Sequence, residues 1–118
     1  MNEHRRRLAG RYRRGLAGLP LTLPVEAPGA RHVYHLYVVR TPERDALARF
    51  LKERGIATGI HYPVPGHRQP AIEPFNPPAL PRTERLVGEI LTLPISAGHT
   101  EAEVDEVVAA IAEFFRGR

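Results

Sequence analysis

Prolines are concentrated between residues 63 and 81, and this density limits the fold more than any other feature of the sequence. Proline lacks a backbone N–H and fixes φ at about −65°, so such a segment continues neither a helix nor a central strand. We therefore predict a rigid, irregular loop over 63–81, between two structured parts. A polyproline ligand for a partner domain is the alternative, but the position between structured segments favours the loop. Its prolines are Pro63, Pro65, Pro70, Pro74, Pro77, Pro78 and Pro81.

Regular hydrophobic patterns precede this loop. Residues 3–18 predict a helix, because apolar residues recur every three or four positions, at Leu8, Tyr12, Leu16 and Leu19. Residues 33–39 predict a strand with large side chains on both faces, so we expect it to be central and covered on both sides. A helix is predicted over 42–54 and a short strand over 56–60. We expect Thr41 to be the N-cap of this helix and Gly55 to end it. The expected buried residues of the helix are Leu47, Phe50 and Leu51.

Further elements are predicted after the loop. A short helix begins near Arg82, marked by Leu86, Val87 and Ile90, and a strand follows over 91–93. Thr100 and Glu103 form a capping box that opens the last helix. The apolar stripe of that helix is Val104, Val107, Val108, Ile111, Phe114 and Phe115. This order of elements predicts an α+β fold in one domain over 1–118, with a small mixed or antiparallel sheet of about three strands covered by helices.

Composition narrows the functional classes. Cysteine is absent, which excludes disulfides, thiolate metal sites and a cysteine nucleophile. A net charge of +4 and an arginine-rich first helix would suit nucleic acid, but no stacking aromatics accompany the arginines, so a solvated helix face is preferred. No long apolar run or signal-peptide pattern is present, and we expect a cytoplasmic protein without membrane contact.

Metal and hydrolase chemistry are disfavoured. His61, His67 and Glu73 could converge on one ion, but their spacing does not match zinc motifs, and no metal is expected. Ser96 is the sole serine and lacks the glycines of a nucleophile elbow, which argues against a hydrolase triad.

The start of the proline-rich loop gathers polar and aromatic side chains on a stiff backbone. Pro63 and Pro65 restrict the chain, so the side chains beside them can meet a ligand at low entropic cost. We predict one exposed rim made by His61, Tyr62, His67 and Gln69. A stiff connector with half-buried histidines remains the alternative interpretation.

A family resemblance adds to this pattern. The stretches that carry it are Tyr34–Val39, Arg44–Leu47, Leu51–Pro65, His67, Gln69–Ala71, Glu84–Leu86, Glu89–Leu91, Leu93–Pro94 and Thr100–Glu101. Together they resemble the C-terminal (small) domain of the DegT/StrS family of pyridoxal-phosphate-dependent sugar aminotransferases, over nearly the whole chain. Gly66, Ile72 and Arg82 depart from the usual family pattern, which leaves the shape of the sugar pocket open.

The resemblance implies a type I aminotransferase fold and a dimer with the active site at the subunit interface. Family members convert a keto sugar linked to a nucleotide into an amino sugar, commonly with glutamate or glutamine as donor. The resemblance further implies that His61, Tyr62, His67 and Gln69 lie near the nucleotide sugar. Residues 1–19 would form the helix that links the large and small domains.

The chemistry of the family nevertheless needs a lysine that holds pyridoxal phosphate as a Schiff base. Lys52 is the only lysine, and it is predicted to be solvated on the far side of its helix. We therefore expect no catalytic and no cofactor-binding residue in this chain, and no transamination by the chain alone. The parent family would supply its lysine from the large domain.

Our interpretation is a C-terminal domain or fragment of a nucleotide-sugar aminotransferase for amino-sugar or polysaccharide biosynthesis. The alternatives are a non-catalytic sugar-nucleotide or protein-binding module and, less favoured, a basic nucleic-acid-binding protein. A small domain alone should expose an apolar surface to a large-domain chain or to a second copy. Leu8, Tyr12 and Leu16 on the first helix are predicted to form that exposed stripe.

Overall fold

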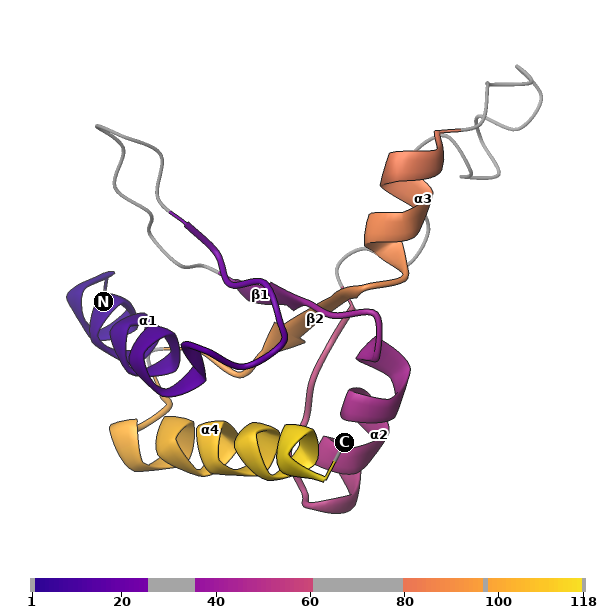
Figure 1. Cartoon of the computed structure of the whole chain (residues 1–118). Coiled ribbons are helices and arrows are strands. Elements are labelled where there is room, and N and C mark those ends of the chain that lie inside the picture. Colours follow the sequence, from indigo (N-terminus) through magenta and orange to yellow (C-terminus); the bar gives the residue numbers. More distant parts are fainter. Residues whose placement is uncertain (1, 26–35, 61–79, 97, 118) are drawn as a thin grey trace.

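The computed structural model describes residues 2–25, 36–60, 80–96 and 98–117 (Figure 1). Its elements are α1 Asn2–Leu16, β1 Tyr37–Arg40, α2 Arg44–Glu53, α3 Pro81–Val87, β2 Ile90–Leu93 and α4 Glu101–Arg116. In Figure 1, α1, α2 and α4 lie on one side of the small sheet, and α3 projects away from them. The predicted α+β class is confirmed.

The sheet pairs β1 with β2 antiparallel, with Tyr37 opposite Leu93 and Val39 opposite Leu91. These four side chains are buried beneath the helices, whereas Val38 and Arg40 are half-buried. The second face is therefore covered only in part, since Val38 is half-buried while Thr92, opposite it, is buried. Residues 33–35 lie outside the described part of the chain.

The predicted strand over 56–60 is also wrong. Gly59 alone forms a bridge to Thr92, with N···O distances of 3.1 and 2.7 Å. The start of the segment is held elsewhere, because the Ile56 N–H donates to the Leu51 carbonyl at the end of α2. In the described residues the sheet therefore has two strands, where about three were predicted.

Helix α2 ends as predicted but begins differently. Its N-cap is Glu43, and the hydroxyl of Thr41 accepts from the Glu43 N–H in the turn before the helix. Gly55 follows the helix at φ +77°, a conformation that favours glycine. Leu47 and Leu51 are buried as expected, and Phe50 is partly buried against the core.

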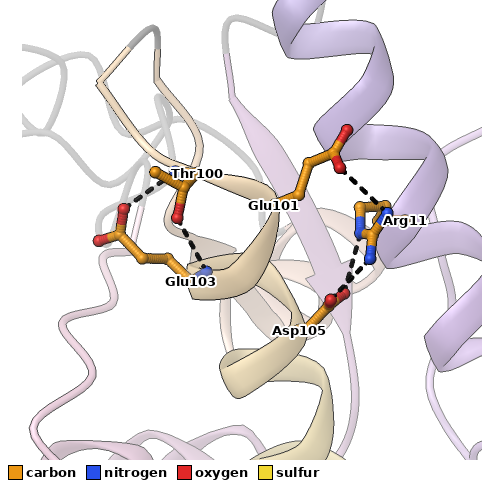
Figure 2. A network of polar contacts seen from close by, with 5 residues as sticks. All are labelled: Arg11, Thr100, Glu101, Glu103 and Asp105. Carbon is orange, nitrogen blue, oxygen red and sulfur yellow. Dashed lines mark hydrogen bonds and ion pairs between the residues drawn. The ribbon is translucent and has the colours of Figure 1, made fainter.

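Helix α4 confirms the predicted capping box and stripe. Thr100 Oγ1 accepts from the Glu103 N–H, and the Glu103 carboxylate accepts from the Thr100 N–H, as Figure 2 shows. These two bonds satisfy donors that the first turn of a helix leaves free. Within the stripe, Val108 is partly buried and the other members are buried: Val104, Val107, Ile111, Phe114 and Phe115.

The predicted exposure of Leu8, Tyr12 and Leu16 is wrong, because all three side chains are fully buried. Helix α1 packs along α4, so the apolar stripes of the two helices cover each other. The Tyr12 ring also stacks on Tyr37 with centroids 4.8 Å apart, and its hydroxyl donates to the Pro94 carbonyl. The arginines of α1 do not prevent this packing, since they lie outside the buried stripe.

Two arginines form ion pairs that join α4 to its neighbours. Arg11 of α1 donates to both carboxylate oxygens of Asp105, at 3.0 and 2.7 Å, and to Glu101 at 3.2 Å (Figure 2). Arg54, at the end of α2, makes a bidentate pair with Glu113 at 2.6 Å for each bond. Such planar, two-bond pairs set the angle at which helices meet more than they add stability at an exposed surface.

These contacts predict an acid-dependent loss of stability. Hydrogen bonds from Arg11, Arg54 and the Thr100 backbone lower the pKa of Asp105, Glu113 and Glu103, respectively. A lowered folded-state pKa gives stability that is complete above about pH 4.5, where the unfolded carboxyls are ionised, and is lost as pH falls through the lower folded values. The thermal midpoint should be level from pH 7 to 5 and fall below pH 4. An equally steep fall in an Asp105→Asn, Glu113→Gln double variant would contradict this origin.

Candidate functional site

The four predicted rim residues, His61, Tyr62, His67 and Gln69, lie outside the described residues, and so does Glu73. The described chain shows how both ends of their segment are attached. Gly59 bridges to Thr92 of β2 just before the segment, and α3 leads from its far end back to Ile90 of β2. The described residues on both sides of this segment are therefore attached to β2.

A second attachment fixes where α3 leaves the body of the protein. The Arg44 guanidinium donates to the carbonyl of Val87 at 3.1 Å and to that of Ile90 at 2.9 Å. The Thr41 N–H donates to the Glu89 carbonyl at 2.9 Å. Hydrogen bonds from the start of α2 therefore hold the turn between α3 and β2 in place. Sequence reasoning did not identify this role of Arg44, because its partners are backbone carbonyls more than 40 residues away.

No residue of α3 is buried in this chain. Leu80, just before the helix, exposes 43% of its surface, and Leu86 and Val87 are half-buried. The turn that Arg44 holds is therefore anchored, while the helix itself leaves the core, as Figure 1 shows.

A cavity of about 420 Å³ lies between the first half of α4 and the chain that follows α2. Its interior is largely apolar, and His99, Glu103 and Glu106 add polar groups. Ile56 and Ala57 on its wall lie shortly before Gly59 in the chain. The sequence carried no signal for this cavity, since its walls come from four separate stretches: Tyr12, Gly55, Ile56, Ala57, Pro94, His99, Glu103, Val104, Glu106 and Val107.

Ser96 and His99 meet in the turn before α4. Ser96 Oγ lies 2.8 Å from His99 Nδ1 and accepts from the Gly98 N–H, while His4 Nε2 lies 2.6 Å from the His99 carbonyl oxygen. A nucleophilic relay needs a third group that orients the base. The nearby Glu103 carboxylate instead accepts from the Thr100 N–H. These contacts therefore stabilise the turn.

Neither a metal nor pyridoxal phosphate fits the described residues. In residues 2–25, 36–60, 80–96 and 98–117, no three His, Asp or Glu side chains are placed to share a metal ion. Lys52, the only lysine, is exposed in the last turn of α2 and lines none of the described cavities. An exposed amine of this kind lacks the enclosed site that a Schiff base with the cofactor requires. The helices of the described chain are also too short or too polar to cross a bilayer.

Comparison with known proteins gives a consistent result. The chain is 44% identical over 116 residues to the dTDP-3-amino-3,4,6-trideoxy-alpha-D-glucose transaminase of Streptomyces venezuelae, covering 96% of this chain and 31% of that protein. It is 36% identical to the dTDP-3-amino-3,6-dideoxy-alpha-D-galactopyranose transaminase of Aneurinibacillus thermoaerophilus, over 96% of this chain and 31% of that one.

Solved structures agree in fold. S. venezuelae DesV, in complex with a ketimine intermediate, matches with a TM-score of 0.92 and 44% identity over 96% of this chain and 31% of that one. An aminotransferase from Brucella abortus matches with a TM-score of 0.86 and 32% identity over the same shares. The chain therefore spans about a third of the length of these relatives. Because the model of the DegT/DnrJ/EryC1/StrS aminotransferase family matches residues 1–112, the chain belongs to that family.

Proposed function

We propose that this chain acts as the small, C-terminal domain of a nucleotide-sugar aminotransferase that uses pyridoxal phosphate. The observation that carries the proposal is the 44% identity to a dTDP-sugar transaminase across 96% of this chain, together with the TM-score of 0.92. The reaction replaces the keto group of a nucleotide-linked sugar by an amino group. Because its charged diphosphate keeps such a sugar from crossing membranes, the proposed setting is the cytoplasm.

The side chains of this chain indicate which part of the proposed enzyme holds the cofactor. Pyridoxal phosphate supplies the electron sink for transamination when it is bound. Since Lys52 is exposed, we assign the cofactor lysine to the part of the relatives that this chain does not match. A large domain, in the same or another polypeptide, is the proposed partner.

The proposed substrate contacts are His61, Tyr62, His67 and Gln69. Imidazole, phenol and amide groups can donate to or accept from sugar hydroxyls and diphosphate oxygens. Pro63 and Pro65 limit the entropy that the segment loses on binding. Two described contacts support this proposal, because they attach the chain on both sides of the segment. Gly59 forms a bridge to Thr92, and the Arg44 guanidinium donates to carbonyls in the turn after α3.

A chimera tests this function. Residues 1–112 would replace the matching third of the S. venezuelae transaminase, and we expect a protein that retains pyridoxal phosphate and transaminates its dTDP-linked sugar. In the chimera, His61→Ala and Gln69→Ala should each lower kcat/KM about tenfold or more with unchanged cofactor content, because each removes a hydrogen bond to substrate. Arg49→Ala, at an exposed position of α2, is the control.

The outcomes of the chimera experiment distinguish the proposals. Unchanged kinetics in the His61 and Gln69 variants would overturn the assigned contacts while leaving the domain assignment intact. A folded chimera without activity, combined with saturable binding of a dTDP-sugar to the isolated chain, would favour a non-catalytic binding module instead.

The isolated chain should form no internal aldimine with pyridoxal phosphate. We expect no cofactor absorption band that borohydride removes, because Lys52 is exposed and without an enclosing pocket among the described residues. In the chimera, Lys52→Arg should leave the cofactor band unchanged. A reduced cofactor adduct mapped to Lys52 would disprove this prediction.

A further inference from the structure

The outer face of α1 carries arginines whose side chains have no partner among the described residues. Arg11 is paired with Asp105 and Glu101 of α4, and Arg6 lies 3.8 Å from Glu3. By contrast, the side chains of three exposed arginines make no hydrogen bond or ion pair in the described part of the chain: Arg7, Arg13 and Arg14. Two of these three, Arg7 and Arg14, line the same surface hollow.

The floor of that hollow is a glycine in the middle of the helix. Glycine in the middle of a helix is less favourable than alanine, so the presence of Gly10 in α1 calls for a reason. Gly15 has one, since a Cβ there would stand 2.5 Å from Val108 of α4. At Gly10 the three atoms nearest to a built Cβ all belong to Arg14, with Nη1 at 3.3 Å. The missing side chain thus makes room for the Arg14 guanidinium over the helix backbone.

The hollow has a volume of about 400 Å³ and is lined by Glu3, Arg6, Arg7, Gly10, Arg14 and Glu101. Its two carboxylates are already engaged, Glu3 near Arg6 and Glu101 with Arg11. The positive charge that these carboxylates do not neutralise comes from Arg7 and Arg14. Two cations beside one hollow repel each other, and an anion between them would reverse the sign of that interaction.

We propose that this hollow binds the phosphate group of a phosphate monoester, held by Arg7 and Arg14 above Gly10. Each guanidinium can donate two parallel hydrogen bonds to one anion. A phosphate group has enough oxygens to accept such a pair of bonds from both arginines, whereas the two oxygens of a carboxylate are used up by one arginine. The volume exceeds that of a bare ion, so the organic group attached to the phosphate also finds space. The site is independent of the proposed transaminase function.

Titration of the full chain with phenyl phosphate, followed by NMR at low salt, tests the site. We expect saturable binding that Arg7→Gln and Arg14→Gln each weaken about tenfold, the loss of one charge-assisted hydrogen-bonding partner. Arg13→Gln is the matched control, because the Arg13 side chain is exposed on the same helix, has no partner among the described residues and does not line the hollow. Its affinity should stay within about twofold of the parent.

Gly10→Ala separates binding from folding. Alanine should raise the thermal midpoint through its helix propensity and still weaken phenyl phosphate binding, because its methyl group displaces the Arg14 guanidinium. Unchanged affinity in Gly10→Ala, no saturation, or equal losses in all three arginine variants would overturn the proposal. Tighter binding of duplex DNA, weakened equally by Arg7, Arg13 and Arg14 substitutions, would instead define a nucleic-acid surface and also overturn it.

A parallel experiment with vesicles that contain phosphatidic acid distinguishes a soluble phosphate monoester from a lipid headgroup. Binding to phenyl phosphate alone supports a soluble ligand. Vesicle binding that Arg14→Gln abolishes and Arg13→Gln preserves supports a lipid headgroup at the same hollow.

Discussion

Tyr12→Ala is expected to lower the free energy of unfolding by about 3–5 kcal/mol, the range for removing a large aromatic side chain from a core. Tyr12 is fully buried, stacks on Tyr37 and connects α1 to the turn after β2 through its hydroxyl, 2.5 Å from the Pro94 carbonyl oxygen. Burial, together with the nearby Tyr37, raises the pKa of this hydroxyl, which therefore remains a hydrogen-bond donor at neutral pH. Urea unfolding followed by circular dichroism measures the effect.

Tyr12→Phe is the matched control for the ring. It keeps the stacked aromatic group and removes only the donor to the Pro94 carbonyl, so we expect a loss of about 1 kcal/mol. Limited proteolysis provides a second measurement, since a detached α1 would be cut quickly. A loss below about 1 kcal/mol for Tyr12→Ala would show that α1 does not pack on this domain in solution.

Gly15→Ala is expected to destabilise the protein although alanine is the better helix former. The new Cβ would stand 2.5 Å from Val108 Cγ1 and 3.1 Å from Cγ2, and a valine in a helix has little rotamer freedom with which to move away. Overpacking of this kind costs about 1–3 kcal/mol, and a separation of 2.5 Å is a severe clash, so the cost exceeds the gain in helix propensity of about 1 kcal/mol. Differential scanning calorimetry compares the variant with the parent.

Two further variants isolate the cause of this effect. Adding Val108→Ala to Gly15→Ala should restore part of the lost stability, because it removes the colliding methyl groups. Gly10→Ala, on the same helix but without a contact to α4 near its Cβ, should be stabilising. A stabilising Gly15→Ala would mean that α1 and α4 lie farther apart than the structure places them.

Local patterns were sufficient for much of the fold. The capping box at Thr100 and Glu103 and the stripe of α4 depend only on residues of one helix and its N-cap, and both were predicted. The glycine stop at Gly55 and the exposure of Lys52 are local as well. The common rim of His61, Tyr62, His67 and Gln69 rests on local stiffness and family resemblance, and it stays a prediction.

Contacts between elements far apart in the chain could not be predicted from the sequence. Periodicity identified the apolar side of α1 at Leu8, Tyr12 and Leu16 but did not reveal what covers it. In the structure α4 covers this side, because the apolar stripes of α1 and α4 pack against each other. Strand pairing failed for a related reason, since a run such as 56–60 has the composition of a strand whether or not a neighbour runs beside it.

The sequence by itself determined which segments form helices, where α4 begins, that the chain lacks thiol chemistry and that its only lysine lies on a solvated helix face. These properties depend on neighbours within a few residues. Tertiary structure alone decided that Arg11 binds Asp105, that Arg44 grips the turn after α3, that Val108 approaches Gly15, and that a cavity opens beside Ile56. Each of these joins residues far apart in the chain, and only the packing of whole elements brings such residues within contact distance.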